Sequence, residues 1–112
     1  MHDEDRVRLR HMIEAAEHAI GFVSGRSRTD QDTDRMLLFA VVRAIEIVGE
    51  AASKISNETH AAHSAIPWRA IIGMRNRLVH ACFDINPDIS WDTVQLALPP
   101  MREQLKAALG AE

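Results

Sequence analysis

The sequence predicts a single all-α domain, an up-and-down four-helix bundle that spans residues 1–112. Four segments repeat apolar residues at spacings of three and four, which is the period of an amphipathic helix. No segment shows the apolar–polar alternation of a half-buried strand. A chain of 112 residues can enclose one packed core and is too short for two domains.

The first expected helix begins in the acidic run 3–5, because negative charge stabilises a helix amino terminus. It ends near Gly25. The polar loop that follows offers Asp30, Asp32 or Thr33 as the cap of the next helix. The apolar positions of this first helix form one stripe: Leu9, Ile13, Ala16, Ile20 and Val23.

The second expected helix runs from about Asp34 to Ser56 and is the longest. It carries two adjacent apolar stripes, which predict burial over more than half of its circumference. We therefore expect it both at the centre of the bundle and in contact with a second subunit. The stripes are Leu37, Val41, Ala44, Val48, Ala51 and Ile55, and Leu38, Val42, Ile45, Gly49 and Ala52.

Residues 57–67 are expected to be a connector with a short helical turn. Pro67 suits the first position of the third helix, where its missing N–H costs nothing. Apolar residues continue that helix from Trp68 to Val79.

The fourth helix is expected after Pro87, because the residues before a proline disfavour helix. Ser90 is a candidate cap. Pro99 and Pro100 should kink this helix, since they remove two backbone donors. Its expected inner face consists of Val94, Leu98, Met101, Leu105 and Ala108.

Composition limits the classes of function. No run approaches the roughly 20 apolar residues of a membrane span, and the amino terminus is too charged for a secretory signal, so we expect a cytoplasmic protein. The single cysteine excludes an internal disulfide and a cysteine-based zinc cluster. The net charge of −3 argues against a protein that is basic overall.

One stretch of the chain is nevertheless locally basic. Residues 59–83 contain no Asp or Glu, and this segregation favours an anionic partner. The basic groups of the stretch are His60, His63, Arg69, Arg75, Arg77 and His80.

The centre of that stretch, "MRNRLVHACFD" at 74–84, allows two interpretations. On a continuous helix Asn76 and His80 would lie on one face, with Arg75 and Arg77 flanking them. One interpretation is a solvated helix edge. The other is a site for a phosphate-bearing ligand.

Arginine and histidine together suffice in principle for phosphodiester cleavage without a metal or cofactor. The guanidinium of Arg75 matches phosphate oxygens, and His80 could accept the proton of a ribose 2′-hydroxyl. A second proton donor is then needed, which a two-fold related His80 could supply. We expect no metal site, since His60 and His63 have no completing ligand nearby except Glu58.

A charged line within the second helix also has two interpretations. Arg43 with Glu46, and Glu50 with Lys54, could form ion pairs along the helix. Alternatively, Glu46 or Glu50 could reach the third helix and orient Arg75 or His80.

The motif "RNRLVH" at 75–80 resembles the Arg-x4-His signature of HEPN-domain ribonucleases, and the surrounding blocks resemble the HepT-like subfamily. These blocks are "AIEIVGEAA" at 44–52, "IPWRAIIGMRNRLVH" at 66–80, Asp84, Trp91 and "LPPM" at 98–101.

The resemblance implies a homodimer whose two motifs share one cleft, and metal-independent cleavage of RNA. Arg75 and His80 would be catalytic with Asn76 as a polar helper, and we expect Arg69 and Arg77 to bind RNA.

The same resemblance implies a partner, a minimal nucleotidyltransferase (MNT) antitoxin in a type II toxin–antitoxin system. Members regulated by AMP transfer carry a tyrosine two residues after the motif histidine. Here that position is Cys82, and the chain contains no tyrosine. This departure keeps a second interpretation open, a non-catalytic RNA- or nucleotide-binding partner of a nucleotidyltransferase. A third is a purely structural helical dimer.

Overall fold

The computed structural model describes residues 1–81 and 84–111, apart from the side chains at 80 and 81. The two long helices are α1 (Asp3–Val23) and α3 (Arg35–Lys54). The remaining elements are α2 (Asp30–Thr33), α4 (Asn57–Ala62), α5 (Trp68–Ile72), α6 (Met74–Leu78), β1 (Val79–Ala81), β2 (Asp84–Ile85), α7 (Pro87–Asp92), the π-helical η1 (Thr93–Ala97) and α8 (Leu98–Gly110).

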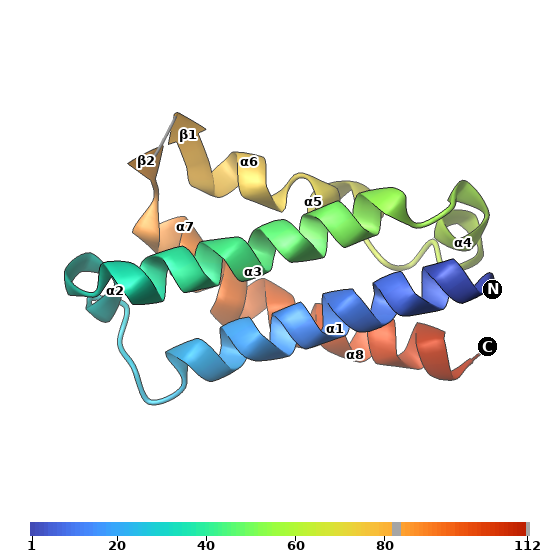
Figure 1. Cartoon of the computed structure of the whole chain (residues 1–112), viewed down its shortest axis with the longest axis horizontal. Coiled ribbons are helices and arrows are strands. Elements are labelled where there is room, and N and C mark those ends of the chain that lie inside the picture. The colour runs from blue at the N-terminus through green and yellow to red at the C-terminus, as the bar shows by residue number, and fades with distance from the viewer. Residues whose placement is uncertain (82–83, 112) are drawn as a thin grey trace.

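The expected all-α, up-and-down bundle is confirmed. Figure 1 shows α1, α3, α5 with α6, and the run from α7 to α8 following one another in alternating directions. Helix α1 packs against α3 and α8, and α5 and α6 pack against α3. None of the described helices is long and apolar enough to cross a membrane.

Helix α3 is the central helix. Every residue of its two predicted stripes is buried within this single chain. One stripe faces α1, and Gly49 of the other lies against the end of α5, where a Cβ would sit 3.4 Å from the carbonyl oxygen of Ile72. The two stripes are therefore explained by the bundle, and they do not require a second subunit.

The amino terminus of α3 is capped by a different residue from those expected. Asp30, Asp32 and Thr33 lie within the extra turn α2. Asp34 follows that turn in an extended conformation, and its Oδ1 accepts a hydrogen bond from the Leu37 N–H at 3.1 Å. Asp34 is the cap because it alone combines extended backbone with the correct spacing to that N–H.

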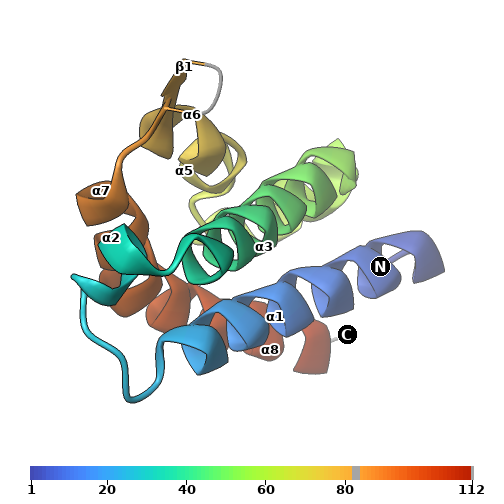
Figure 2. The same ribbon diagram turned by 60° about the vertical axis from the view of Figure 1, so that its left-hand side comes forward.

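The predicted third helix is not continuous. Gly73 divides it into α5 and α6, and helix ends at Leu78. The chain then forms an antiparallel pair of short strands, β1 and β2, which Figure 2 shows on the far side of α3 from α1 and α8. The Asn86 N–H donates to the Leu78 carbonyl at 2.8 Å and closes this hairpin. The expectation of no strand was wrong.

The residues that cap the starts of the predicted third and fourth helices also differ from the expectation. Pro67 precedes α5 as its cap residue rather than opening the helix. Asn86 caps α7 by accepting bonds from the backbone N–H groups of Asp88 and Ile89, and Pro87 takes the first helical position. Ser90, the predicted cap, is fully buried inside α7.

The predicted inner face of the fourth helix is buried, but its path is interrupted. The π-helical turn η1 ends at Ala97, and Leu98 separates it from the Pro99–Pro100 pair. These prolines have no backbone N–H to donate to the preceding turn. The α-helical hydrogen bonds are therefore interrupted there, and η1 adopts the wider hydrogen-bond spacing of a π-helix.

A buried carboxylate joins the start of α1 to the start of α4. Asp5 accepts hydrogen bonds from the Ser56 N–H at 3.1 Å, the Ser56 hydroxyl at 2.6 Å and the Thr59 hydroxyl at 2.7 Å. Burial by itself opposes ionisation of Asp5, but these bonds outweigh it and lower its pKa from the ordinary value. Its contribution to stability is therefore present above the unfolded pKa, about 4, and is lost as pH falls through the lower folded value.

We expect Asp5→Asn to lower the free energy of unfolding at pH 7 by about 1–3 kcal/mol, because an amide cannot accept all three bonds as a carboxylate does. Urea denaturation at pH 7 and at pH 3 measures the effect. The gap between wild type and variant should narrow at pH 3. Asp3→Asn, on the exposed side of the same helix turn, is the control, and an equal loss in both variants would contradict the role of the buried network.

Candidate functional site

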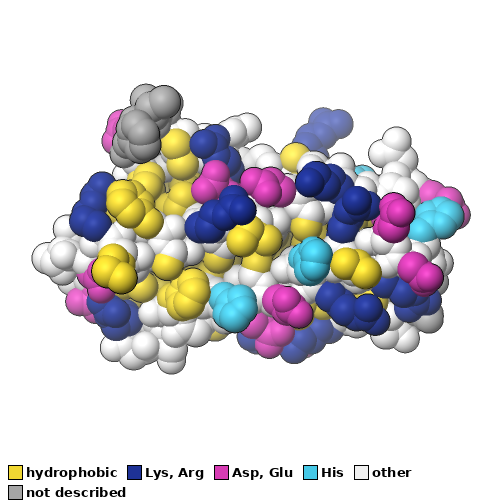
Figure 3. Space-filling model, in the orientation of Figure 1, with side chains coloured by type: hydrophobic (Ala, Val, Ile, Leu, Met, Phe, Trp, Pro, Cys, Tyr) yellow, Lys and Arg dark blue, Asp and Glu magenta, His cyan; other side chains and the backbone are white. Residues whose placement is uncertain are grey.

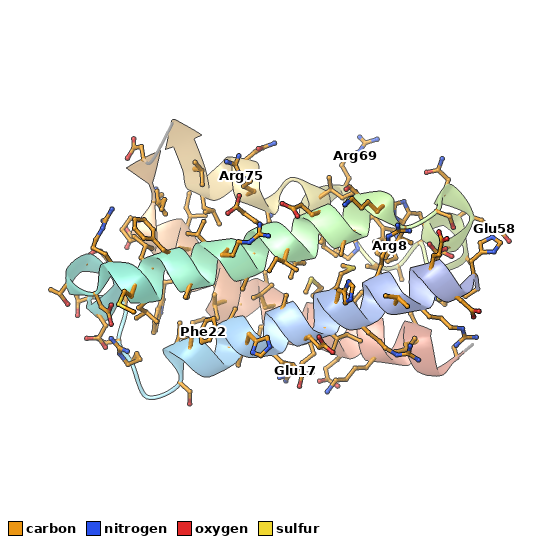
Figure 4. All side chains as sticks on the ribbon, in the orientation of Figure 1. Arg8, Glu17, Phe22, Glu58, Arg69 and Arg75 are labelled. Atoms are coloured by element: carbon orange, nitrogen blue, oxygen red, sulfur yellow. The ribbon has the colours of Figure 1, made fainter. Side chains whose placement is uncertain are left out.

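The central interaction of the motif is an ion pair between α6 and α3. The Nε of Arg75 lies 2.7 Å from Oε2 of Glu46, and 29 residues separate the two in sequence. The Arg75 side chain is 51% exposed and that of Glu46 is 25% exposed. Figure 4 shows Arg75 beside the middle of α3. The carboxylate therefore holds an accessible guanidinium in one orientation.

The contact uses the part of the guanidinium that leaves its anion-binding edge available. A guanidinium has five N–H donors, and Nε supplies one of them. Within the part of the chain that the structure describes, the terminal nitrogens of Arg75 make no hydrogen bond. They form a paired donor set that matches two oxygens of one phosphate.

The other residues of the predicted site on this segment are also exposed, and we call Arg69, Arg75, Asn76 and Arg77 of α5 and α6 the arginine ridge. Asn76 and Arg77 are exposed on α6, and Arg69 is exposed on α5, where Figure 4 shows it pointing away from α3. Among the described residues neither Arg69 nor Arg77 forms an ion pair. Two further arginines thus accompany the contact of Arg75 with Glu46 on one short segment.

The backbone geometry corrects the predicted arrangement of Asn76 and His80. Asn76 belongs to α6, whereas His80 belongs to β1, so the two do not lie on one helix face. The strand register shifts between Val79 and Ala81, which makes the ladder irregular at His80. The His80 side chain and Cys82 lie outside the described residues. The catalytic roles assigned to Arg75, Asn76 and His80 stay predictions.

The two glutamates of α3 differ in their contacts. Glu50 pairs with Arg43 of its own helix at 3.4 Å, and Glu46 pairs with Arg75. The first interpretation, which paired Arg43 with Glu46 and Glu50 with Lys54, is therefore wrong, because Glu46 faces α6 and Glu50 pairs with Arg43. Of the two glutamates considered for orienting the motif, Glu46 is the one in contact with it.

The His60 side chain is held by contacts with the core and the backbone. Its Nε2 lies 3.0 Å from the Ala52 carbonyl oxygen, and its ring stacks on Trp68 with centroids 4.5 Å apart. Trp68 is buried in the core. Among the side chains that the structure describes, those of 1–79 and 84–111, no group of three His, Cys, Asp or Glu is arranged to hold a metal ion.

A buried polar pair that the sequence reasoning missed anchors the segment after the motif. Gln31 of α2 donates to the Pro87 carbonyl at 3.0 Å and accepts from the Ser90 hydroxyl at 3.0 Å. Both side chains are fully buried. The sequence Asn86–Pro87, a cap followed by a proline, signals the start of α7 but not its contact with Gln31. The anchor holds the end of the β1–β2 hairpin against α2.

An apolar groove of about 400 Å³ runs between α1 and α3. Figure 3 shows apolar side chains gathered on the left half of this face. The groove is lined by Ala15 and Phe22 of α1, and by Ala40, Ala44 and Ile47 of α3, with His11, Glu14, His18 and Arg43 at its edges.

The chain is similar to proteins of a known family. The family model described as "Ribonuclease HepT-like" matches residues 12–108. "Putative RNase TTE0752" of Caldanaerobacter subterraneus subsp. tengcongensis is 38% identical over 104 residues, which is 93% of each chain. "Probable ribonuclease HepT" of Thermococcus cleftensis is 41% identical over 69 residues, 62% of this chain and 63% of that protein.

A third relative comes from another organism. "Putative RNase MJ1380" of Methanocaldococcus jannaschii is 30% identical over 95 residues, 85% of this chain and 87% of that protein. No solved structure matches the fold significantly. The helical bundle, the match over residues 12–108 and the similarity to the Caldanaerobacter protein along nearly its full length agree, and the chain belongs to the ribonuclease HepT-like family.

Proposed function

We propose that this protein is a metal-independent endoribonuclease whose motif Arg75–His80 cleaves RNA in a cleft between two subunits. The observation that carries the proposal is the Arg75–Glu46 contact, which orients an exposed guanidinium and leaves its paired donors available. Family membership and the names of the relatives support RNA as the substrate.

The chemistry assigns one role to each group. His80 removes the proton of a ribose 2′-hydroxyl, a step typically worth 10²–10⁴ in rate. Arg75 stabilises the negative charge that gathers on the phosphorus oxygens in the transition state. Asn76 is a polar helper, and Arg69 and Arg77 attract the phosphate backbone. His80 of the second copy protonates the leaving oxygen.

We expect His80→Ala and Arg75→Ala each to lower RNA cleavage in EDTA by about 100-fold or more, because each removes a group that acts in the transition state. Gel analysis of total cellular RNA measures the products. Arg10→Ala, at an exposed arginine of α1, is the matched control and should cleave as wild type does.

Two outcomes would contradict the proposal. Equal cleavage by wild type and both variants removes the catalytic assignment. RNA binding without any cleavage by the wild-type protein leaves the non-catalytic partner module as the function, the alternative that the absence of tyrosine supports.

Glu46 acts on catalysis through Arg75. Its carboxylate fixes the plane of the Arg75 guanidinium. The paired donors of Arg75 then face the phosphate in one side-chain conformation, so less conformational entropy is lost when RNA binds. Because one contact near 2.7 Å determines this orientation, loss of Glu46 should lower kcat more than it raises KM.

We expect Glu46→Ala to lower kcat by about 10- to 100-fold. Glu46→Gln should lose less, because an amide oxygen still accepts from Nε. Steady-state cleavage of a short labelled RNA separates kcat from KM. Glu103→Ala, which removes an exposed carboxylate from an arginine of α8, is the control. An equal loss from Glu50→Ala would contradict the specific role of Glu46.

A second copy of the chain is the proposed occupant of the groove between α1 and α3. The groove reaches Arg43 on the exposed side of α3, the helix that also carries Glu46, so a two-fold partner in the groove would bring the two copies of α3 together. Its edges alternate acidic Glu14 with basic Arg43 and histidines, which allows opposite charges to meet in a two-fold arrangement.

We expect Ala40→Arg to convert a dimer into a monomer, because a charge on the groove floor would be desolvated without a partner. Light scattering over a range of concentrations measures the mass. Ala107→Arg, at an exposed alanine of α8, should leave the dimer intact. A wild-type protein that is monomeric at all concentrations would contradict this interface.

The proposed biological setting is a type II toxin–antitoxin system with a minimal nucleotidyltransferase as the antitoxin. The sequence contains no tyrosine, so the antitoxin cannot act by tyrosyl modification of this chain. Neutralisation would then depend on masking the Arg75 ridge or on modification of another group.

A further inference from the structure

Phe39 is an exposed aromatic residue on the motif side of α3. Its side chain is 48% exposed. It lies seven residues before Glu46, which corresponds to about 10 Å along the helix axis and only about 20° around it. Phe39 and the contact of Arg75 with Glu46 therefore share one face of α3.

The ring does not belong to the core or to the groove. The buried residues of α3 lie on the opposite arc, and the groove is lined by Ala40, Ala44 and Ile47 on the α1 side. The described ring contact of Phe39 is with Arg35, whose guanidinium carbon lies 5.0 Å from the ring centroid. Folding of the chain alone does not explain why an aromatic side chain stands there.

The charges around the ring fit a polyanion. Arg35 stands over the ring itself, and Arg75 and Arg77 lie on the neighbouring ridge. The acids on this face of α3 are engaged, Glu46 by Arg75 and Glu50 by Arg43. An exposed aromatic plane among cations is the combination by which proteins bind single-stranded nucleic acid.

We propose that Phe39 and Arg35 form a stacking platform for one unpaired base of the RNA, next to the phosphate held by Arg75. This inference rests on the proposed ribonuclease function and adds the substrate class, single-stranded RNA. A paired base is already stacked within its duplex and presents no free face to the ring. The platform therefore selects unpaired segments without reading their sequence.

The test measures RNA affinity in a His80→Ala background, so that cleavage does not interfere. Fluorescence anisotropy compares a labelled single strand with a duplex that contains the same strand. Phe39→Ala and Phe39→Leu should each weaken single-strand binding by at least about five-fold, since stacking is lost in both. Phe39→Trp should restore it, and duplex binding should change by less than about two-fold.

Two controls separate the platform from other causes. Leu96→Ala removes an exposed apolar side chain of η1 and should leave the Kd unchanged. Light scattering of Phe39→Ala should give the wild-type mass. A changed mass would place the ring in a protein interface and overturn the proposal, and so would Phe39→Leu binding the single strand as tightly as wild type.

The outcomes distinguish this inference from the function on which it rests. Cleavage by wild type together with affinity that is indifferent to Phe39 overturns the platform and leaves the ribonuclease standing. Aromatic-dependent binding of single strands by a protein that cleaves no RNA leaves the platform and overturns the ribonuclease.

Discussion

The close approach of α5 to α3 at Gly49 is the constraint on which the site depends. A Cβ at this position would lie 3.4 Å from the carbonyl oxygen of Ile72 and 3.5 Å from that of Ile71, so the backbones of the two helices approach to within van der Waals contact of a single methyl group. Because the end of α5 rests directly on α3, α6 begins within side-chain reach of the next turn. Glu46 is one helical turn from Gly49, and it meets Arg75 there.

The site is therefore held together from two sides. Packing of α5 against α3 sets the position of the arginine ridge, and the buried pair of Gln31 and Ser90 fixes the chain after the hairpin. The motif lies between these two anchors, partly on a helix and partly on a strand. Rigid elements on both sides of a functional segment limit the positions its groups can sample, which favours a preorganised site.

The helical periodicity predicted the core because burial depends on the position of apolar residues around a helix, and this is readable from spacing. It did not predict the break at Gly73 or the strands after Leu78. The residues after Leu78 would continue a helical pattern as well as they start a strand, and the hairpin is closed by a backbone bond from Asn86 to Leu78 that apolar spacing does not reveal. The prediction that Asn76 and His80 lie on one helix face was wrong for this reason.

The sequence by itself determined the all-α class, the buried face of each long helix, the basic segment and the motif that carries the family resemblance, since all of these follow from residue type and spacing. Only the tertiary structure decided which glutamate meets Arg75, because Glu46 and Glu50 are equivalent in charge and differ in the direction they face. The tertiary structure also decided that the side chain of Phe39 is accessible to solvent on the motif side of α3. Contacts between distant segments depend on how the helices pack, and local patterns carry no record of that packing.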